Sequence, residues 1–163
     1  MMIVEDGTGI ADANSYVTLE EAETYFQTKG VGACHITESD LIAATEYIDL
    51  AYGDVYMGRL YSNEQGLLFP RTGFYDRNTR QVEEGTIPKE LKRAVFYAAK
   101  LKSEGTDLIT SKDRESNIKT ITQGVSGAVS QSKTYFDRGQ ENTAFIGGVI
   151  YPIIGDFYDK VKV

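Results

Sequence analysis

The clearest structural signal in the chain is the stretch PKELKRAVFYAAKLKSEG, residues Pro88 to Gly105. Proline is favoured at the beginning of a helix and glycine just beyond its end. The apolar side chains between them recur at helical spacing, at Leu91, Val95, Ala98 and Leu101. This pattern predicts an amphipathic helix with one buried face, and it makes a mainly α fold the natural starting point.

Two more helices are predicted upstream. In TLEEAETYFQTKG, Thr18 and Glu21 have the spacing of a capping box, and Gly30 ends the helix. In TESDLIAATEYIDLAYG, Thr37 or Ser39 is the expected N-cap. The apolar positions are Leu19, Ala22 and Phe26 in the first helix, and Leu41, Ala44, Ile48 and Ala51 in the second.

A long polar segment, GLLFPRTGFYDRNTRQVEEGTIPKEL (residues 66–91), lies between the second helix and the one after Pro88. A short helical turn is expected just before it, where Ser62 and Gln65 have capping-box spacing. Loops longer than about 12–15 residues are usually functional, disordered or misassigned. Because both flanking helices are well supported, we interpret residues 69–87 as a long ordered loop that contacts a partner.

The last third of the chain changes period. IKTITQGV and AVSQSKTYF both alternate, and the glycines between them predict a β-hairpin over residues 116–136. Neither strand has a strongly apolar face, so we expect a protruding hairpin that pairs or packs with something else. In YPIIGDFYDKVKV, Pro152 suits the first turn of a C-terminal helix or tail over residues 151–163, entered through a flexible Gly147–Gly148 pair.

These elements together predict one mainly α domain over residues 1–163. It would be a small bundle of about four to five helices, with an N-terminal arm at 1–13 and a helical core at 14–105. The chain of 163 residues, 41% hydrophobic and 25% charged, is long enough for one real core. No segment predicts a membrane span or a signal peptide, so we expect a soluble protein made inside the cell.

Charge and composition narrow the function classes. A net charge of −7, with no cluster of four or more Lys or Arg, argues against nucleic-acid binding. The 11 Tyr and 7 Phe, against no Trp, are typical of half-buried contact surfaces. A stacking platform for single-stranded nucleic acid is the less favoured interpretation of these aromatics, because no basic groove accompanies them in the sequence.

The residues with catalytic chemistry do not form a recognisable constellation. Cys34 and His35 are adjacent, and neighbours in sequence generally point apart. DRNTRQVEEG has some features of a calcium loop, but Arg80 stands where the third ligand would be. A hydrolase with two distant carboxylates stays open as the least favoured alternative. We therefore predict no enzyme, with no catalytic, cofactor or metal site.

Three stretches carry a resemblance: ANSYVTLEEAETYFQTKG, LIAATEYID and LLFPRTGFYDRNTRQVEEGTIPKELKRAVFYAAKL. Together they resemble the head–tail adaptor proteins of tailed bacteriophages, also called head-completion or connector proteins. Some members of that family are catalogued as DnaT-like single-stranded DNA-binding proteins. The likeness runs from Ala13 to about Leu101, and its motifs are Asn14–Ser15–Tyr16, Tyr47–Ile48–Asp49, Phe69–Pro70–Arg71–Thr72–Gly73 and Ile87–Pro88.

This resemblance implies a structural virion protein with an all-α core and a hairpin. Twelve copies would form a homo-oligomeric (dodecameric) ring on the portal protein, joining the capsid to the tail and extending the DNA channel. The implied partners are the portal, a tail or stopper (tail-terminator) protein, and duplex DNA that passes without specific binding, with no membrane. Such a protein would be made in the cytoplasm of the host bacterium and reside in the virion.

The contact surfaces expected under this interpretation are the long loop, the hairpin and the C-terminal segment. The candidate interface residues are Phe69, Pro70, Arg71, Tyr75, Arg77, Arg80, Ile118, Ile121, Tyr135, Phe136, Tyr151, Phe157 and Tyr158. Arg71 is the favoured ion-pairing anchor. The alternative function is a single-stranded DNA-binding protein of phage replication, which a salt-dependent affinity would distinguish.

Overall fold

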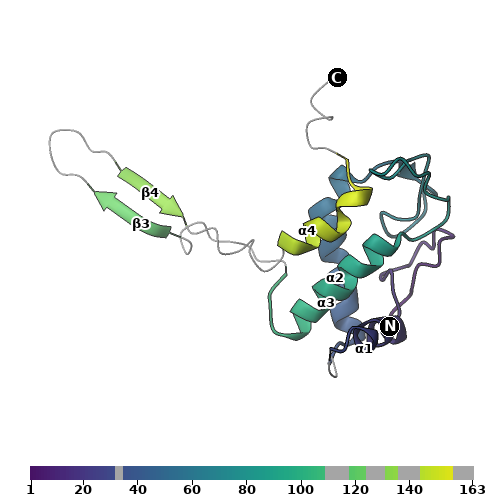
Figure 1. Ribbon diagram of the computed structural model, residues 1–163, viewed down its shortest axis with the longest axis horizontal. Helices are drawn as coiled ribbons and strands as arrows, with labels where there is room; N and C mark the ends of the chain where they lie inside the picture. Colours follow the sequence, from purple (N-terminus) through teal and green to yellow (C-terminus); the bar gives the residue numbers. More distant parts are fainter. Residues whose placement is uncertain (32–34, 109–117, 124–130, 136–143, 156–163) are drawn as a thin grey trace, which may run out of the picture.

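The computed structural model describes residues 1–31, 35–108, 118–123, 131–135 and 144–155, and this part of the chain is mainly helical (Figure 1). Its helices are α1 (Leu19–Thr28), α2 (Glu38–Tyr52), α3 (Lys89–Ser103) and α4 (Ala144–Ile150), with short 3-10 helices η1 (Gly53–Val55) and η2 (Tyr151–Ile153). Its strands are β1 (Arg59–Leu60), β2 (Arg71–Thr72), β3 (Ile118–Gln123) and β4 (Gln131–Tyr135). The predicted mainly α class and the antiparallel hairpin β3–β4 are confirmed.

Helices α1 and α2 begin where the capping signals predict. Thr18 Oγ1 accepts the N–H of Glu21 at 3.0 Å, and the Glu21 carboxylate accepts the N–H of Thr18 at 2.9 Å. The same reciprocal pair forms between Thr37 and Asp40, so Thr37 is the N-cap of α2 rather than Ser39. Both boxes satisfy N–H groups that a helix start would otherwise leave without partners.

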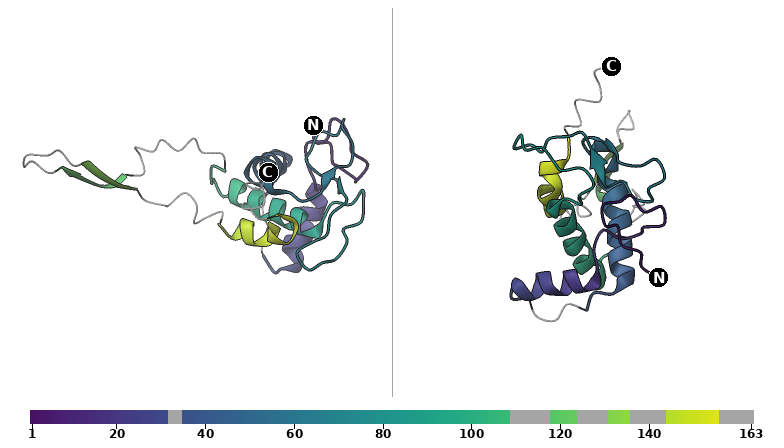
Figure 2. Two further views of the ribbon diagram at one scale, coloured as in Figure 1. Left: turned by 90° about the horizontal axis from the view of Figure 1, so that it is seen from above. Right: turned by 90° about the vertical axis from the view of Figure 1, so that its right-hand side faces the viewer.

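The helices pack around one apolar core. Helices α2 and α3 make an extensive contact, α4 packs on α3, and α1 lies across one end of the α2–α3 pair (Figure 2). The largest fully buried apolar side chains are Tyr16, Phe69, Leu41, Ile48, Leu91, Ile146, Ile150, Ile153, Val17 and Val95. They come from α2, α3, α4 and η2 and from the segments before α1 and after β1, while α1 contributes Ala22 and Phe26.

A buried hydrogen-bond network joins three segments that are far apart in sequence. The Tyr16 hydroxyl donates to the Asp49 carboxylate at 2.7 Å and accepts the backbone N–H of Phe69 at 3.1 Å. Asp49, on α2, also accepts the backbone N–H of Leu68 at 3.1 Å and the Tyr56 hydroxyl at 3.3 Å. This network fixes the segment after α2 against both the N-terminal segment and α2 itself.

The environment of the network keeps its phenols protonated. Burial, reinforced by the neighbouring Asp49 carboxylate, raises the pKa of Tyr16 and of Tyr56 well above the ordinary value. Burial also raises the pKa of Asp49, although the hydrogen bonds from Tyr16 and Leu68 oppose that rise. Both phenols are therefore dependable donors to Asp49 over the physiological pH range.

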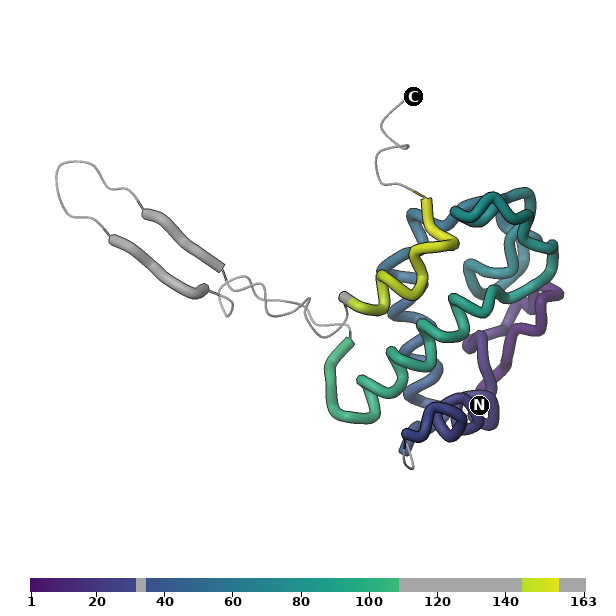
Figure 3. Tube along the Cα trace, viewed as in Figure 1, coloured from purple at the N-terminus to yellow at the C-terminus, as the bar shows by residue number. Residues whose placement is uncertain are grey.

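The N-terminal segment is folded rather than extended. The buried Glu5 carboxylate accepts the N–H groups of Gly7 and Gly9, each at 2.9 Å, and the N–H of Ile10 at 2.8 Å. Figure 3 shows this segment running alongside the chain that follows α2, where the Gly66 N–H donates to the Ile10 carbonyl at 3.0 Å. The N-terminus is thereby attached to the body of the molecule.

The long segment between α2 and α3 is ordered by its own hydrogen bonds. Strands β1 and β2 pair antiparallel, and a further bridge joins Tyr75 to Gln81. Within that bridge the Asp76 carboxylate accepts the N–H groups of Asn78 and Arg80. After η1 the segment therefore forms two successive loops, the first closed by β1 and β2 and the second by the bridge between Tyr75 and Gln81.

Two predictions about local structure are wrong. At Ser62 the N–H does donate to the Gln65 side chain at 2.8 Å, but these residues form a turn and no helix. The last helix was predicted to begin at 151, whereas α4 ends at Ile150 and a single 3-10 turn follows.

The reason for the second error is the position of the apolar face. Ile146, Ile150 and Ile153 are the buried residues, so the helical face begins before Tyr151. The pair Gly147–Gly148, expected to be a flexible entry, lies inside α4. Residues 156–163 of the predicted terminal helix lie outside the described part.

Replacing Tyr16 with Phe tests the network. The Tyr16→Phe change removes one donor to Asp49 and the acceptor of the Phe69 N–H while it keeps the buried ring. The free energy of unfolding, measured by urea denaturation, should fall by about 1–3 kcal/mol, because a buried backbone donor loses its partner. The control is Tyr47→Phe on α2, the helix that carries Asp49, and it should change stability by less than about 0.5 kcal/mol. Equal effects of the two substitutions would contradict this role for Tyr16.

Candidate nucleic-acid interface

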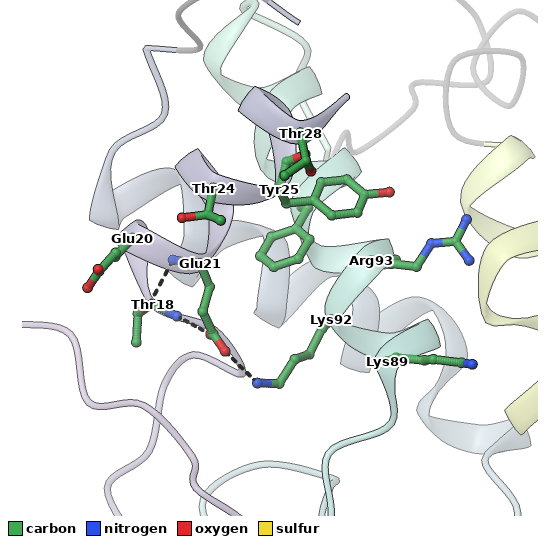
Figure 4. A pocket seen from close by; sticks show the side chains of 10 residues that line it. Thr18, Glu20, Glu21, Thr24, Tyr25, Thr28, Lys89, Lys92 and Arg93 are labelled. Atoms are coloured by element: carbon green, nitrogen blue, oxygen red, sulfur yellow. Dashed lines mark hydrogen bonds and ion pairs between the residues drawn. The ribbon is translucent and has the colours of Figure 1, made fainter. Parts of the chain in front are cut away.

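A groove of about 590 Å³ separates α1 from the first half of α3 (Figure 4). One wall consists of Thr18, Glu20, Glu21, Thr24, Tyr25 and Thr28, and the other of Lys89, Lys92, Arg93 and Phe96. The capping box at Thr18 sets where α1 begins and so which of its side chains face α3. The groove combines apolar rings with charged side chains, which is the composition expected of a ligand site.

The apolar part of the groove is a cluster of aromatic rings. Tyr25 stacks on Phe96 with ring centroids 4.8 Å apart and an interplanar angle of 27°. Phe96 is only 5% exposed, whereas Tyr25 is half-buried and lies at the groove. Tyr97 meets Tyr25 edge-on at 6.0 Å, and their hydroxyls share a hydrogen bond of 3.2 Å. These contacts hold the Tyr25 ring in a fixed orientation.

Cations surround this aromatic cluster. Lys89 and Arg93 are exposed and lie one turn apart on α3. The Lys29 ammonium group lies 5.7 Å from the centroid of the Tyr25 ring. Lys92 forms an ion pair with Glu21 at 2.7 Å across the groove. Four cations therefore lie at or beside the groove, against the two carboxylates of Glu20 and Glu21, although the chain as a whole carries −7.

The electrostatics of the two phenols reflect these charges. Burial raises the pKa of Tyr25, but the hydrogen bond from Tyr97 and the charges of Arg93 and Lys29 outweigh burial, so the net pKa is lowered. The same hydrogen bond raises the pKa of Tyr97. The positive charges of Arg93 and Lys29 lie close enough to the Tyr25 hydroxyl to favour negative charge there. The groove thus suits a ligand with both planar rings and anionic groups.

Three of the interface residues predicted from the long loop contact the chain itself. Phe69 and Pro70 are fully buried in the core. Arg71 is half-buried, and its guanidinium donates to the carbonyls of Met57 and Gly58 at 2.8 and 2.9 Å. Arg71 therefore connects β2 to the turn after η1, and its partners are backbone carbonyls rather than a carboxylate. Its role as an ion-pairing anchor between subunits stays untested.

The remaining loop residues lie on the surface. Tyr75 is 60% exposed. Arg80 forms an ion pair with Asp76 at 2.9 Å. The Arg77 guanidinium lies 4.0 Å from the centroid of the Tyr151 ring and donates to its hydroxyl at 3.0 Å. Of the predicted interface residues whose side chains the structure describes, none lines the α1–α3 groove.

The hairpin and tail predictions concern residues of which less is described. The backbone register pairs Ile118 with Tyr135 and Ile121 with Lys133. Phe136, Phe157 and Tyr158 lie outside the described residues, so their predicted interface roles stay predictions.

The loop that resembles a calcium site is organised differently. The Asp76 carboxylate is occupied by the N–H groups of Asn78 and Arg80 and by the Arg80 side chain. The backbone N–H of Arg80 is the main reason why the pKa of Asp76 is lowered. Within the described ranges no three His, Cys, Asp or Glu side chains gather as ligands for a metal ion. Nor does any helix in those ranges have the length and apolarity needed to cross a membrane.

The match to known proteins covers almost the whole chain. Residues 1–156 match the family described as "Putative DnaT-like ssDNA binding protein". The protein belongs to this family. No curated protein and no solved structure matches the chain.

This match corrects the functional interpretation of the sequence. The resemblance to a family with DnaT-like members is confirmed, whereas nothing supports the head–tail adaptor assignment. The predicted structural virion role is wrong, and with it the ring on the portal, the portal and tail partners, and duplex DNA passing without specific binding. The virion role followed from the resemblance, and the net charge of −7 was counted against nucleic-acid binding.

The sequence signal for the α3 side of this site is a helical spacing and not a run of consecutive basic residues. Lys89, Arg93 and Tyr97 are spaced four apart, which places them on one face of a helix. That spacing was visible in the sequence. The partners that α1 contributes, Tyr25 and Lys29, could not be assigned to the same site without the packing of α1 on α3.

The ion pair across the groove gives a pH-dependent test. Hydrogen bonds from Lys92 and Thr18 outweigh the opposing effect of burial and lower the pKa of Glu21 below its ordinary value of 4.5. The ionised carboxylate therefore stabilises the fold above that pH, and the contribution is lost as the pH falls. Glu21→Gln keeps an acceptor for the Thr18 N–H and loses only the ion pair. Because the pair is partly exposed, the urea-unfolding free energy should fall by only about 0.5 kcal/mol near neutral pH.

The difference between wild type and Glu21→Gln should shrink as the pH falls below 4.5 and vanish once the wild-type carboxylate is protonated. Glu20→Gln, at the exposed neighbouring position, is the matched control and should show no such pH dependence. A Glu21→Gln difference that stays constant from neutral to acid pH would contradict the ion-pair assignment.

Proposed function

We propose that this protein binds single-stranded DNA in the groove between α1 and α3. The observation that carries the proposal is the Tyr25 ring, stacked on Phe96 and bordered by Lys29, Lys89 and Arg93. Membership of a family described by single-stranded DNA binding supports it.

The chemistry of a single strand fits such a groove. Its bases are free to unstack, and each offers a planar face to an aromatic side chain, which contributes about 1–3 kcal/mol per base. Duplex DNA keeps its bases stacked inside the helix, so a fixed tyrosine ring has no base to bind. The phosphates of the strand are the natural partners of Lys89 and Arg93, because both side chains are exposed.

The acidic composition shapes the expected affinity. Net negative charge repels DNA at long range, and this repulsion is screened by salt. At the groove, three cations of α3 face Glu20 and Glu21, and one of those acids is already paired with Lys92. Base stacking therefore carries a larger share of the binding than in a strongly basic protein. Tolerance of base sequence follows, since every base has a planar face.

The proposal concerns binding without catalysis. Its ligand contacts are stacking and ion pairing, and neither breaks a covalent bond. Synthesis in the bacterial cytoplasm stays a prediction of the sequence.

Equilibrium binding of a fluorescent oligothymidine of about 20 nucleotides, followed by anisotropy, tests the proposal. Arg93→Ala and Lys89→Ala should each weaken binding and reduce the slope of log affinity against log salt by roughly 1, because each removes one phosphate contact. Tyr25→Leu should weaken binding by about 5-fold or more through loss of one stacking face.

The matched control is Arg59→Ala, since Arg59 is an exposed cation on β1 away from the groove. It should leave affinity and salt slope unchanged. The proposal is wrong if the wild type shows no salt-dependent binding to single strands, or if Arg59→Ala and Arg93→Ala have equal effects.

A further inference from the structure

The aromatic contacts continue beyond the groove. Tyr97 meets Tyr25 of α1 at 6.0 Å on one side and Phe145 of α4 at 5.4 Å on the other, edge-on in both cases. A continuous series of rings therefore links α1, α3 and α4. Each step is between one and two times the spacing of about 3.4 Å between stacked bases in a DNA strand.

Phe145 is the unusual member of this series. It is 44% exposed, whereas the next residue, Ile146, is completely buried. The attachment of α4 to α3 is provided by Ile146 and Ile150, so packing does not require an aromatic ring at position 145. A phenylalanine that the core does not need, held by a tyrosine and open to solvent, is available to a planar ligand.

The cations of α3 accompany this series. Arg93 lies four residues before Tyr97 and Lys100 three residues after it, so all three share one side of the helix. Lys100 is partly exposed and makes an ion pair of 3.4 Å with the more exposed Glu104. A DNA strand that leaves the groove along the aromatic series would therefore have positive side chains beside it near Phe145 as well as near Tyr25.

We propose that Phe145, supported by Tyr97, is a second base-stacking subsite, so that the strand runs from the α1–α3 groove across α3 to α4. This inference rests on the proposed function. The ligand at this subsite is a nucleobase of single-stranded DNA, with Arg93 and Lys100 facing the phosphates on either side of it. A strand held at two stacking points is bound more tightly, and occupies more nucleotides, than one held in the groove alone.

The absence of tryptophan makes a direct test possible, since Phe145→Trp introduces a single indole into the chain. Its emission should lose about half its intensity when oligothymidine binds, because a stacked base quenches an indole. An abasic oligonucleotide of the same length carries the same charge without bases and should cause little quenching. The matched control is Leu50→Trp on α2, where the side chain is 70% exposed, and it should not respond to either oligonucleotide.

A second set of variants measures the contribution to affinity. Phe145→Ala should weaken binding of oligothymidine by about 5-fold or more, while Phe145→Tyr keeps a stacking face and should retain the wild-type affinity. The thermal unfolding midpoints of both variants verify that α4 stays packed, as expected for an exposed side chain.

The outcomes distinguish the two proposals. Failure of the wild-type protein to bind any single strand by anisotropy overturns the proposed function. Normal binding with no quenching in Phe145→Trp, and with wild-type affinity in Phe145→Ala, overturns the second subsite alone. Quenching by the abasic oligonucleotide equal to that by oligothymidine also overturns it, because contact would then involve the backbone rather than a base.

Discussion

The fold depends on the Asp49 carboxylate, which receives hydrogen bonds from Tyr16, Tyr56 and the backbone of Leu68. A carboxylate withdrawn from water is costly unless donors surround it, and here they come from three segments of the chain. The Tyr16 hydroxyl adds a bond to the N–H of Phe69, so the same phenol serves as donor and acceptor. The N-terminal segment, α2 and the chain after η1 must all be in place before the whole network is formed.

The site is a consequence of this constraint. The segment around Phe69 is fixed on α2, and the ordered turns that follow it lead to Pro88, the N-cap of α3. The contact of α2 with α3 buries the apolar face of α3 and leaves its basic face directed toward α1. The Glu21 side chain then serves two purposes, because it completes the capping box of α1 and forms the ion pair with Lys92. Stability and the shape of the groove are thus coupled through α1.

The residues that carried the family resemblance are the ones that build the fold. Tyr16, Asp49 and Phe69 belong to three separate motifs and meet in one network. Residues that a buried network requires identify a fold, and a shared fold does not by itself define a function. The resemblance could therefore find the right set of sequences while the inferred virion role was wrong. Net charge is a sum over the whole chain, whereas a ligand responds to the field at its site.

The sequence by itself determined the local structure. Capping residues at Thr18 and Thr37 and the apolar spacing after Pro88 predicted three helices, because those signals act between neighbouring residues. The last helix was misplaced because its buried face, at Ile146 and Ile150, is recognisable only against α3. The candidate site was likewise decided by tertiary structure. The cations on α3 could be recognised in the sequence by their helical spacing. Tyr25, however, is more than sixty residues away from Lys89 in sequence. Only the packing of α1 across α3 brings the Tyr25 ring close to those cations.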